Sequence, residues 1–227
     1  SDIHKLSVKR VHGIGDKRAE VLKQVGIHTV ADLLGFLPYR YLDRSTEAPL
    51  SALPVDREVT AVGEVVSARM VPGRRPRFIA TVRDGSANLD CVWFAGYKYV
   101  KDSFQIGDWV SLGGKLTAFR GQRQMVHPEV EVLAGPDEEE DRIHTGGIIP
   151  LYRTTAMMKA SYLTARTLRR LIKGALEELE VTDSVSPDLR SGLVGLAEAY
   201  SGVHFPDTID DVEAGRRRLA FEELLTI

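Results

Sequence analysis

The feature that most constrains the fold is a row of strand patterns within residues 57–133. Apolar and polar residues alternate along these patterns, which places every second side chain on one face of a strand. Asp84 and Gly85 are typical of a tight turn between the second and third patterns. Gly63 and Gly113 fit a sheet whose strands bend sharply. The expected strands cover 59–66, 78–82, 89–94, 109–119 and 124–133.

A short helix is expected at 97–104, between the third and fourth strands. Three strands, a short helix and a two-stranded hairpin follow one another in the order of an OB-fold, a small barrel that binds single strands or oligosaccharides. The sequence therefore predicts an α+β chain of three parts. A helical hairpin segment covers 1–46, a central five-stranded OB-fold barrel covers 55–134, and a linker with helices covers 135–227.

Charge and cysteine content narrow the function classes. Residues 1–132 carry 19 Lys and Arg against 15 Asp and Glu, whereas residues 133–227 carry 11 against 17 and include an acidic run at 137–141. This asymmetry is compatible with nucleic-acid binding by the first part. Cys91 is the only cysteine, and no apolar run approaches a membrane span or a signal peptide. We expect a cytoplasmic protein without a membrane partner and without a metal site.

A glycine-flanked turn near the N-terminus is a candidate phosphate site. Gly13 and Gly15 bracket one apolar residue and precede a helix, and Lys17 adds positive charge. Together with Thr29, which is suited to cap a second helix, the pattern is that of a helix-hairpin-helix. Backbone N–H groups beside a helix N-terminus bind phosphate. The alternative is a hairpin that only packs against its neighbours.

The barrel carries candidate DNA-binding residues of two kinds. A loop with three arginines follows the first strand and suits phosphates, although it could equally be a solvated basic loop. Trp93 and Phe94 are adjacent in a strand, so one of them leaves the core. Tyr97 and Tyr99 follow at the strand exit, where a ring could stack on a base or plug the barrel end. The candidate cations are Arg74, Arg75, Arg77, Lys98, Arg120 and Arg123.

Several motifs resemble the N-terminal region of RecG, the ATP-dependent DNA helicase that remodels stalled forks. They are the Gly-Ile-Gly turn, the Leu-Pro-Tyr-Arg-Tyr-Leu-Asp-Arg run at 37–44, Met-Val-His-Pro-Glu at 125–129, His-Phe-Pro at 204–206 and Arg-Arg-Leu-Ala-Phe-Glu-Glu-Leu at 217–224. The resemblance implies a wedge domain that binds branched DNA, at a replication fork or Holliday junction, in DNA repair and recombination. It also implies that rings matching Phe94 and either Tyr97 or Tyr99 stack on junction bases.

The helicase motor has no counterpart in the sequence. A phosphate-binding Walker A loop needs Gly, four residues and Gly-Lys-Ser/Thr, and the nearest approach, Gly113-Gly114-Lys115-Leu116, lacks both the first Gly and the Ser/Thr. We therefore expect no catalysis and no cofactor in this chain, while the resemblance implies ATP and Mg in the full-length parent. The implied partners are branched DNA and the motor domains of the same chain, and we expect a monomer.

Two other functions remain open at this stage. A helix-hairpin-helix DNA repair enzyme would need a catalytic Lys or Asp after the hairpin, for which only Asp32 or Asp43 offers itself. An OB-fold protein-interaction module would use the aromatic residues equally well. Binding to forked DNA against linear duplex at matched salt separates these functions.

Overall fold

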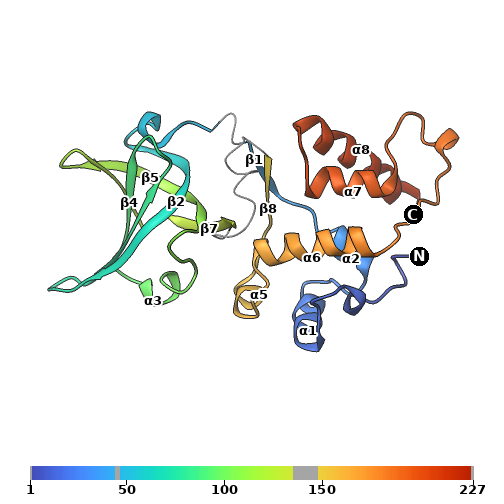
Figure 1. The fold of residues 1–227 in the computed structure, drawn as a ribbon, viewed down its shortest axis with the longest axis horizontal. Coiled ribbons are helices and arrows are strands. Elements are labelled where there is room, and N and C mark those ends of the chain that lie inside the picture. The colour runs from blue at the N-terminus through green and yellow to red at the C-terminus, as the bar shows by residue number, and fades with distance from the viewer. Residues whose placement is uncertain (1, 44–46, 135–147, 226–227) are drawn as a thin grey trace. The chain divides into compact units, whose positions relative to one another are not determined.

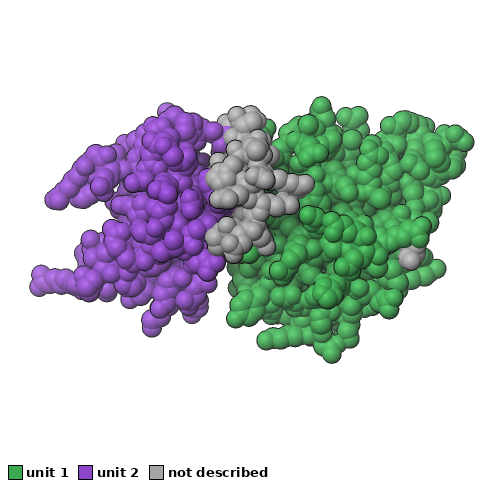
Figure 2. Space-filling view, viewed as in Figure 1, with its two compact units in different colours: residues 1–44, 145–227 green, residues 45–144 purple. Residues whose placement is uncertain are grey.

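The structure is a computed structural model that describes residues 2–43, 47–134 and 148–225. The chain divides into two compact units (Figure 2). Unit 1 combines residues 1–44 with 145–227, and unit 2 is formed by residues 45–144. The segments predicted at 1–46 and 135–227 thus contribute to one unit rather than two. The boundaries predicted at 46 and 135 and the acidic run at 137–141 lie outside the described residues.

Unit 2 is the predicted barrel (Figure 1). Its strands follow the order β2-β3-β4-β6-β5, and β5 pairs with β2 to close the barrel. The β4–β6 pair is parallel and the other pairs are antiparallel. Five strands in this order, with helix α3 before the fourth, make an OB-fold. The elements are η2 (Leu50–Ala52), β2 (Arg57–Val71), β3 (Arg77–Arg83), β4 (Asn88–Trp93), α3 (Tyr97–Val100), β5 (Trp109–Phe119), β6 (Gln122–Val126) and β7 (Glu129–Ala134).

Strand β2 serves two neighbours because it is long and bent. Its first half pairs with β5 and its second half with β3, with a bulge between Val65 and Ser67. Gly63 stands where the two pairings meet. A Cβ added there would lie 2.7 Å from the carbonyl oxygen of Arg83. The close approach of β3 therefore requires glycine at this position.

The expected strand 124–133 is wrong, because the structure has two strands there. His127 adopts a positive φ of 52°, and Pro128 has no N–H to donate to a ladder. The His127 N–H instead donates to the Val92 carbonyl oxygen at 2.8 Å, which anchors the break to β4. After the break, β7 pairs with β5 as an additional strand. The expected helix 97–104 also ends earlier, at Val100.

Unit 1 is completed by two short strands that come from distant parts of the chain. β1 (Arg40–Asp43) pairs antiparallel with β8 (Ile148–Leu151), so the barrel sequence lies between two paired strands. The other elements of this unit are helical. They are η1 (Val8–Arg10), α1 (Asp16–Gln24), α2 (Val30–Leu34), α5 (Ala156–Ala160), α6 (Ala165–Glu178), η3 (Pro187–Leu189), α7 (Leu196–His204) and α8 (Ile209–Leu225).

The core of unit 1 is shared between both ends of the chain. Leu22 and Leu33 from the first helices are fully buried in one cluster with Leu168 and Ile172 of α6. The predicted cap of α2 is confirmed, because Thr29 accepts from the Asp32 N–H and Asp32 accepts in return from the Thr29 N–H. The N-terminal segment therefore depends on α6 for its apolar core.

A buried histidine of α7 links that helix to the end of α2 and to the residue that follows β8. His204 is fully buried, with Nε2 2.6 Å from the Leu34 carbonyl oxygen and Nδ1 2.8 Å from the Tyr152 hydroxyl. Since a carbonyl only accepts, Nε2 carries the proton and Nδ1 accepts from Tyr152. Burial lowers the pKa of His204 to about 4, against the weaker raising effect of the bond to Leu34. The neutral ring is therefore the folded form at neutral pH.

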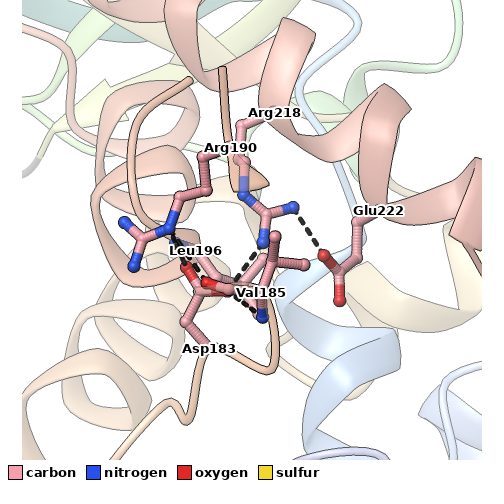
Figure 3. Close-up of polar contacts among 6 residues, drawn as sticks. All are labelled: Asp183, Val185, Arg190, Leu196, Arg218 and Glu222. Atoms are coloured by element: carbon pink, nitrogen blue, oxygen red, sulfur yellow. Dashed lines mark hydrogen bonds and ion pairs between the residues drawn. The ribbon is translucent and has the colours of Figure 1, made fainter. Parts of the chain in front are cut away.

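A buried arginine holds α8 in unit 1 (Figure 3). The Arg218 side chain is fully buried, and its guanidinium donates to Glu222 at 2.5 Å and to Asp183 at 2.8 Å. Asp183 also accepts from the backbone N–H groups of Val185 and Leu196 and lies 3.4 Å from Arg190 Nε. These hydrogen bonds lower the pKa of Asp183 although its burial acts to raise it. The cluster ties α8 to the segment before α7.

Candidate nucleic-acid interface

Two hairpins project from the same side of the barrel (Figures 1 and 2). We call them arm 1, residues 68–80 of β2 and β3, and arm 2, residues 117–124 of β5 and β6. At the tip of arm 1, Arg74 and Arg75 are exposed and Arg77 is half-buried. At the tip of arm 2, the Arg120 guanidinium lies 5.3 Å from the centre of the Phe119 ring. Both arms therefore carry cations at the tips of protruding two-stranded hairpins.

Trp93 at the end of β4 and Phe94 directly after it point apart, as the alternation predicts. Trp93 is buried and packs against Phe78 and Phe104, with ring centres 5.8 and 6.1 Å away. Phe94 is 44% exposed at the strand exit, and Tyr99 in α3 is 85% exposed. Tyr97 is half-buried against the barrel core. The exposed rings are therefore Phe94 and Tyr99, and we call the region from Phe94 to Tyr99 the barrel rim.

His127 holds the backbone beside Phe94. Its Nε2 accepts from the Phe94 N–H at 3.5 Å, and the two rings lie 6.2 Å apart. The positive φ of His127 and its N–H bond to Val92 bring the ring back over the end of β4. This explains the Met-Val-His-Pro-Glu motif in structural terms. The sequence showed the motif but gave no sign that His127 contacts Phe94, because the two residues are 33 positions apart.

The remaining predicted cations of the barrel differ in their roles. Lys98 is exposed in α3 next to Tyr99. The Arg123 guanidinium instead donates to the carbonyl oxygens of Ser51 and Leu53, both at 2.6 Å. Arg123 thus fastens η2 to β6. Its positive charge remains at the barrel surface, but both terminal nitrogens already bind the protein.

The N-terminal hairpin has the predicted turn. Gly13 has a φ of 93°, and Gly15 is the N-cap of α1 without a side-chain capping bond. An added Cβ at Gly13 would lie 3.1 Å from Leu171, so the turn packs tightly on α6. Lys17 is exposed in the first turn of α1, whereas Arg18 donates to the Gly13 carbonyl oxygen at 2.9 Å. The turn contains exposed backbone and one cation, and its interior face has a packing role.

Two further exposed apolar residues lie on the arms and were not among the predicted site residues. Phe119 is 60% exposed at the tip of arm 2, and Met70 is 43% exposed on arm 1. For Phe119 the signal available was the Arg120-Gly121 turn, where both residues have positive φ and which places its neighbours at a hairpin tip. In the described part of the chain, no three His, Cys, Asp or Glu side chains are grouped to bind a metal. None of the helices described is long and apolar enough to cross a membrane.

The fold and this rim together define a class of protein, in which an OB-fold barrel with basic arms and exposed rings is inserted into the sequence of a helical unit. The sequence profile of the RecG wedge domain matches residues 7–179. The chain belongs to the RecG wedge domain family. The resemblance noted in the sequence and the α+β fold with its OB barrel are thereby confirmed.

Individual relatives agree with this assignment. The ATP-dependent DNA helicase RecG of Escherichia coli strain K12 is 31% identical over 226 residues, covering 94% of this chain and 31% of that protein. RecG of Thermotoga maritima is 28% identical and covers 97% of this chain and 28% of that protein. A solved structure of RecG bound to a three-way DNA junction superposes with a TM-score of 0.64, 28% identity, and coverage of 97% of this chain and 30% of that one. The chain thus spans about a third of the length of these relatives.

Proposed function

We propose that this chain is the branched-DNA-binding part of a RecG-type helicase that acts in DNA repair and recombination. The observation that carries the proposal is the barrel rim, where exposed Phe94 and Tyr99 lie on the unit that also bears two basic arms. The related RecG structure contains a three-way DNA junction, which supports a branched ligand. The proposed DNA-binding residues are Phe94, Tyr97, Lys98, Tyr99, Arg74, Arg75, Arg77, Arg120, Arg123, Gly13, Gly15 and Lys17.

The two kinds of residue have different tasks in this proposal. Arginines on the arms bind phosphates of any duplex, so they provide affinity without selecting a shape. Exposed rings stack on a base only where that base is already unpaired, because flipping a paired base costs a few kcal/mol. Stacking returns about 1–3 kcal/mol per base. The rings therefore supply the preference for a junction.

The proposal is tested by combining Phe94→Ala, Tyr97→Ala and Tyr99→Ala. Affinity for forked DNA should fall about tenfold or more, as expected for a loss of 1–3 kcal/mol per stacked base, while the weaker binding to linear duplex stays nearly unchanged. Because Tyr97 is half-buried, its loss could disturb the barrel. The double variant Phe94→Ala with Tyr99→Ala retains Tyr97 and therefore separates the loss of exposed rings from a loss of folding. A folded variant that keeps the wild-type fork-to-duplex ratio would show that these rings do not recognise the junction.

The wider setting follows from the same proposal. The partners are branched DNA and the motor domains that RecG relatives carry in the rest of their length. ATP and Mg would act in those motor domains, and this chain would require no cofactor. We place the protein in the cytoplasm as a monomer. Sedimentation of the isolated chain and an ATPase assay with DNA present test its oligomeric state and its lack of catalysis.

A further inference from the structure

Unit 1 contains a basic stretch that the negative net charge of residues 133–227 does not reveal. Residues 148–176 contain six cations and no Asp or Glu, although residues 133–227 carry 11 Lys and Arg against 17 Asp and Glu. Most of this stretch forms α5 and α6. The local surplus is therefore large enough to bind an anion. The six cations are Arg153, Lys159, Arg166, Arg169, Arg170 and Lys173.

Three of these cations form a row on α6. Leu168, Leu171, Ile172 and Ala175 bury one side of the helix in the core of unit 1. Arg166, Arg170 and Lys173 follow at spacings of four and three residues, which places them on the opposite side. Arg170 and Lys173 are exposed and Arg166 is half-buried. We call these three residues the α6 basic face.

The turn before α6 repeats the backbone of the N-terminal hairpin. In each turn a residue with positive φ is followed by a buried apolar residue and then by the N-cap of a helix. The first turn has Gly13 (φ 93°), Ile14 and Gly15, and the second has Tyr162 (φ 59°), Leu163 and Thr164. The N–H four residues after each N-cap donates to the N-cap carbonyl oxygen at 2.9 Å.

The two hairpins are packed together but differ in charge. α1 contacts α5, α2 contacts α6, and the turn at Gly13 lies against Leu171 of α6. In the first hairpin, residues 2–37 carry six Lys and Arg against four Asp and Glu. In the second, the α6 basic face adds three cations, and the sequence of that hairpin holds no Asp or Glu as far as residue 176. The second hairpin therefore has the larger positive charge.

We propose that the α6 basic face binds the sugar-phosphate backbone of a duplex DNA arm. The row from Arg166 to Lys173 extends over about 10 Å at 1.5 Å per residue, and a duplex presents about one negative charge per 1.7 Å of its axis. This inference rests on the proposed function, since it assigns a second contact for the same branched DNA. Because backbone contacts carry no information on sequence or branching, the face adds affinity and leaves the choice of junction to the barrel rim.

The test combines Arg166→Gln, Arg170→Gln and Lys173→Gln in the 227-residue chain. A matched control combines Lys5→Gln, Lys23→Gln and Arg217→Gln, three exposed cations of the same unit, so that both variants lose the same charge. Binding to a forked DNA and to a linear duplex is measured at several NaCl concentrations. The basic-face variant should bind both DNAs at least about tenfold more weakly at about 0.1 M salt, and its salt slope should be shallower by about two to three.

Circular dichroism and thermal unfolding of both variants establish that the substituted chains fold. Equal slopes for the basic-face variant and the control would overturn the inference while the proposed function stands. A basic-face variant that loses fork binding but keeps duplex binding would also overturn it, because the face would then sense the branch. If the wild-type chain shows no preference for forks at any salt concentration, the proposed function itself has failed.

Discussion

The residues that stand out in the two units differ in burial. In unit 1, Arg218 and His204 are fully buried and bond to other parts of the same unit. In unit 2, Phe94 is exposed, and His127 accepts the Phe94 N–H from an exposed position. Buried polar residues of the first kind stabilise the core, whereas exposed residues of the second kind are the ones that the proposed function assigns to DNA.

The largest effect expected from this comparison is that of removing the buried arginine. Arg218→Ala removes the guanidinium that bonds to both Asp183 and Glu222, and breaking a buried pair in this way costs about 3–5 kcal/mol. The neighbouring Arg217→Ala is the control, because Arg217 is exposed and lies 3.6 Å from Glu213. That surface pair should contribute less than about 1 kcal/mol. Denaturant unfolding measures both, and equal effects would contradict the inward role of Arg218.

The next effect concerns acid stability. His204 has an ordinary pKa of 6.5 in the unfolded chain and about 4 in the folded one, so the unfolded state binds more protons between these values. Stability from this residue is complete above pH 6.5 and is lost as the pH falls to 4. The loss is about 3 kcal/mol at roughly 1.36 kcal/mol per pKa unit. His204→Gln should flatten this pH dependence relative to the wild type, whereas exposed His12→Gln should preserve it.

A smaller effect is expected at the surface of the barrel. Replacing Arg74, Arg75 and Arg77 by Ala should weaken binding to every DNA shape and make the salt slope shallower by about one unit for each phosphate that these arginines neutralise. Stability should hardly change, because none of the three arginines belongs to the apolar core of the barrel. The salt dependence of binding is the measurement. An unchanged slope would mean that the loop is only solvated.

The smallest effect is expected for His127→Ala. This substitution removes the acceptor for the Phe94 N–H and the ring beside Phe94, so the preference for forks should fall a few-fold with little change in duplex affinity. Val126→Ala is a neighbouring control, because its side chain is 46% exposed. If both variants keep the wild-type fork preference, the role of His127 is limited to the break between β6 and β7.

Local patterns predicted many elements of this chain. The strand at Trp109–Phe119 is confirmed with its bounds, because its pattern is long and periodic. The break at His127 was missed because a positive φ at a non-glycine residue leaves no trace in composition. The sharing of unit 1 by both chain ends was missed because β1 and β8 are about a hundred residues apart.

The sequence predicted which types of residue the candidate site contains, but not which individual rings are exposed. Alternation required either Trp93 or Phe94 to leave the core, but the choice depends on which face the closed barrel encloses. The choice between Tyr97 and Tyr99 likewise depends on how α3 sits on the barrel, which makes Tyr99 the exposed ring. The sequence analysis assigned no function to the α6 basic face, because it considered net charge over half the chain. The net charge of each side of the predicted helix would have indicated this basic face.

The pairing of β1 with β8 has a consequence for how the chain is made. Synthesis proceeds from the N-terminus, so all strands of the barrel have been synthesised before β8 and α6 are available. Until then the apolar side chains of Leu22 and Leu33 in the first two helices are not buried, because their core partners Leu168 and Ile172 are synthesised later. We therefore expect a ribosome-bound intermediate in which the barrel is folded and the N-terminal helices are still protease-sensitive. Residues 16–34 would thus become native after the barrel, although they precede it in the sequence.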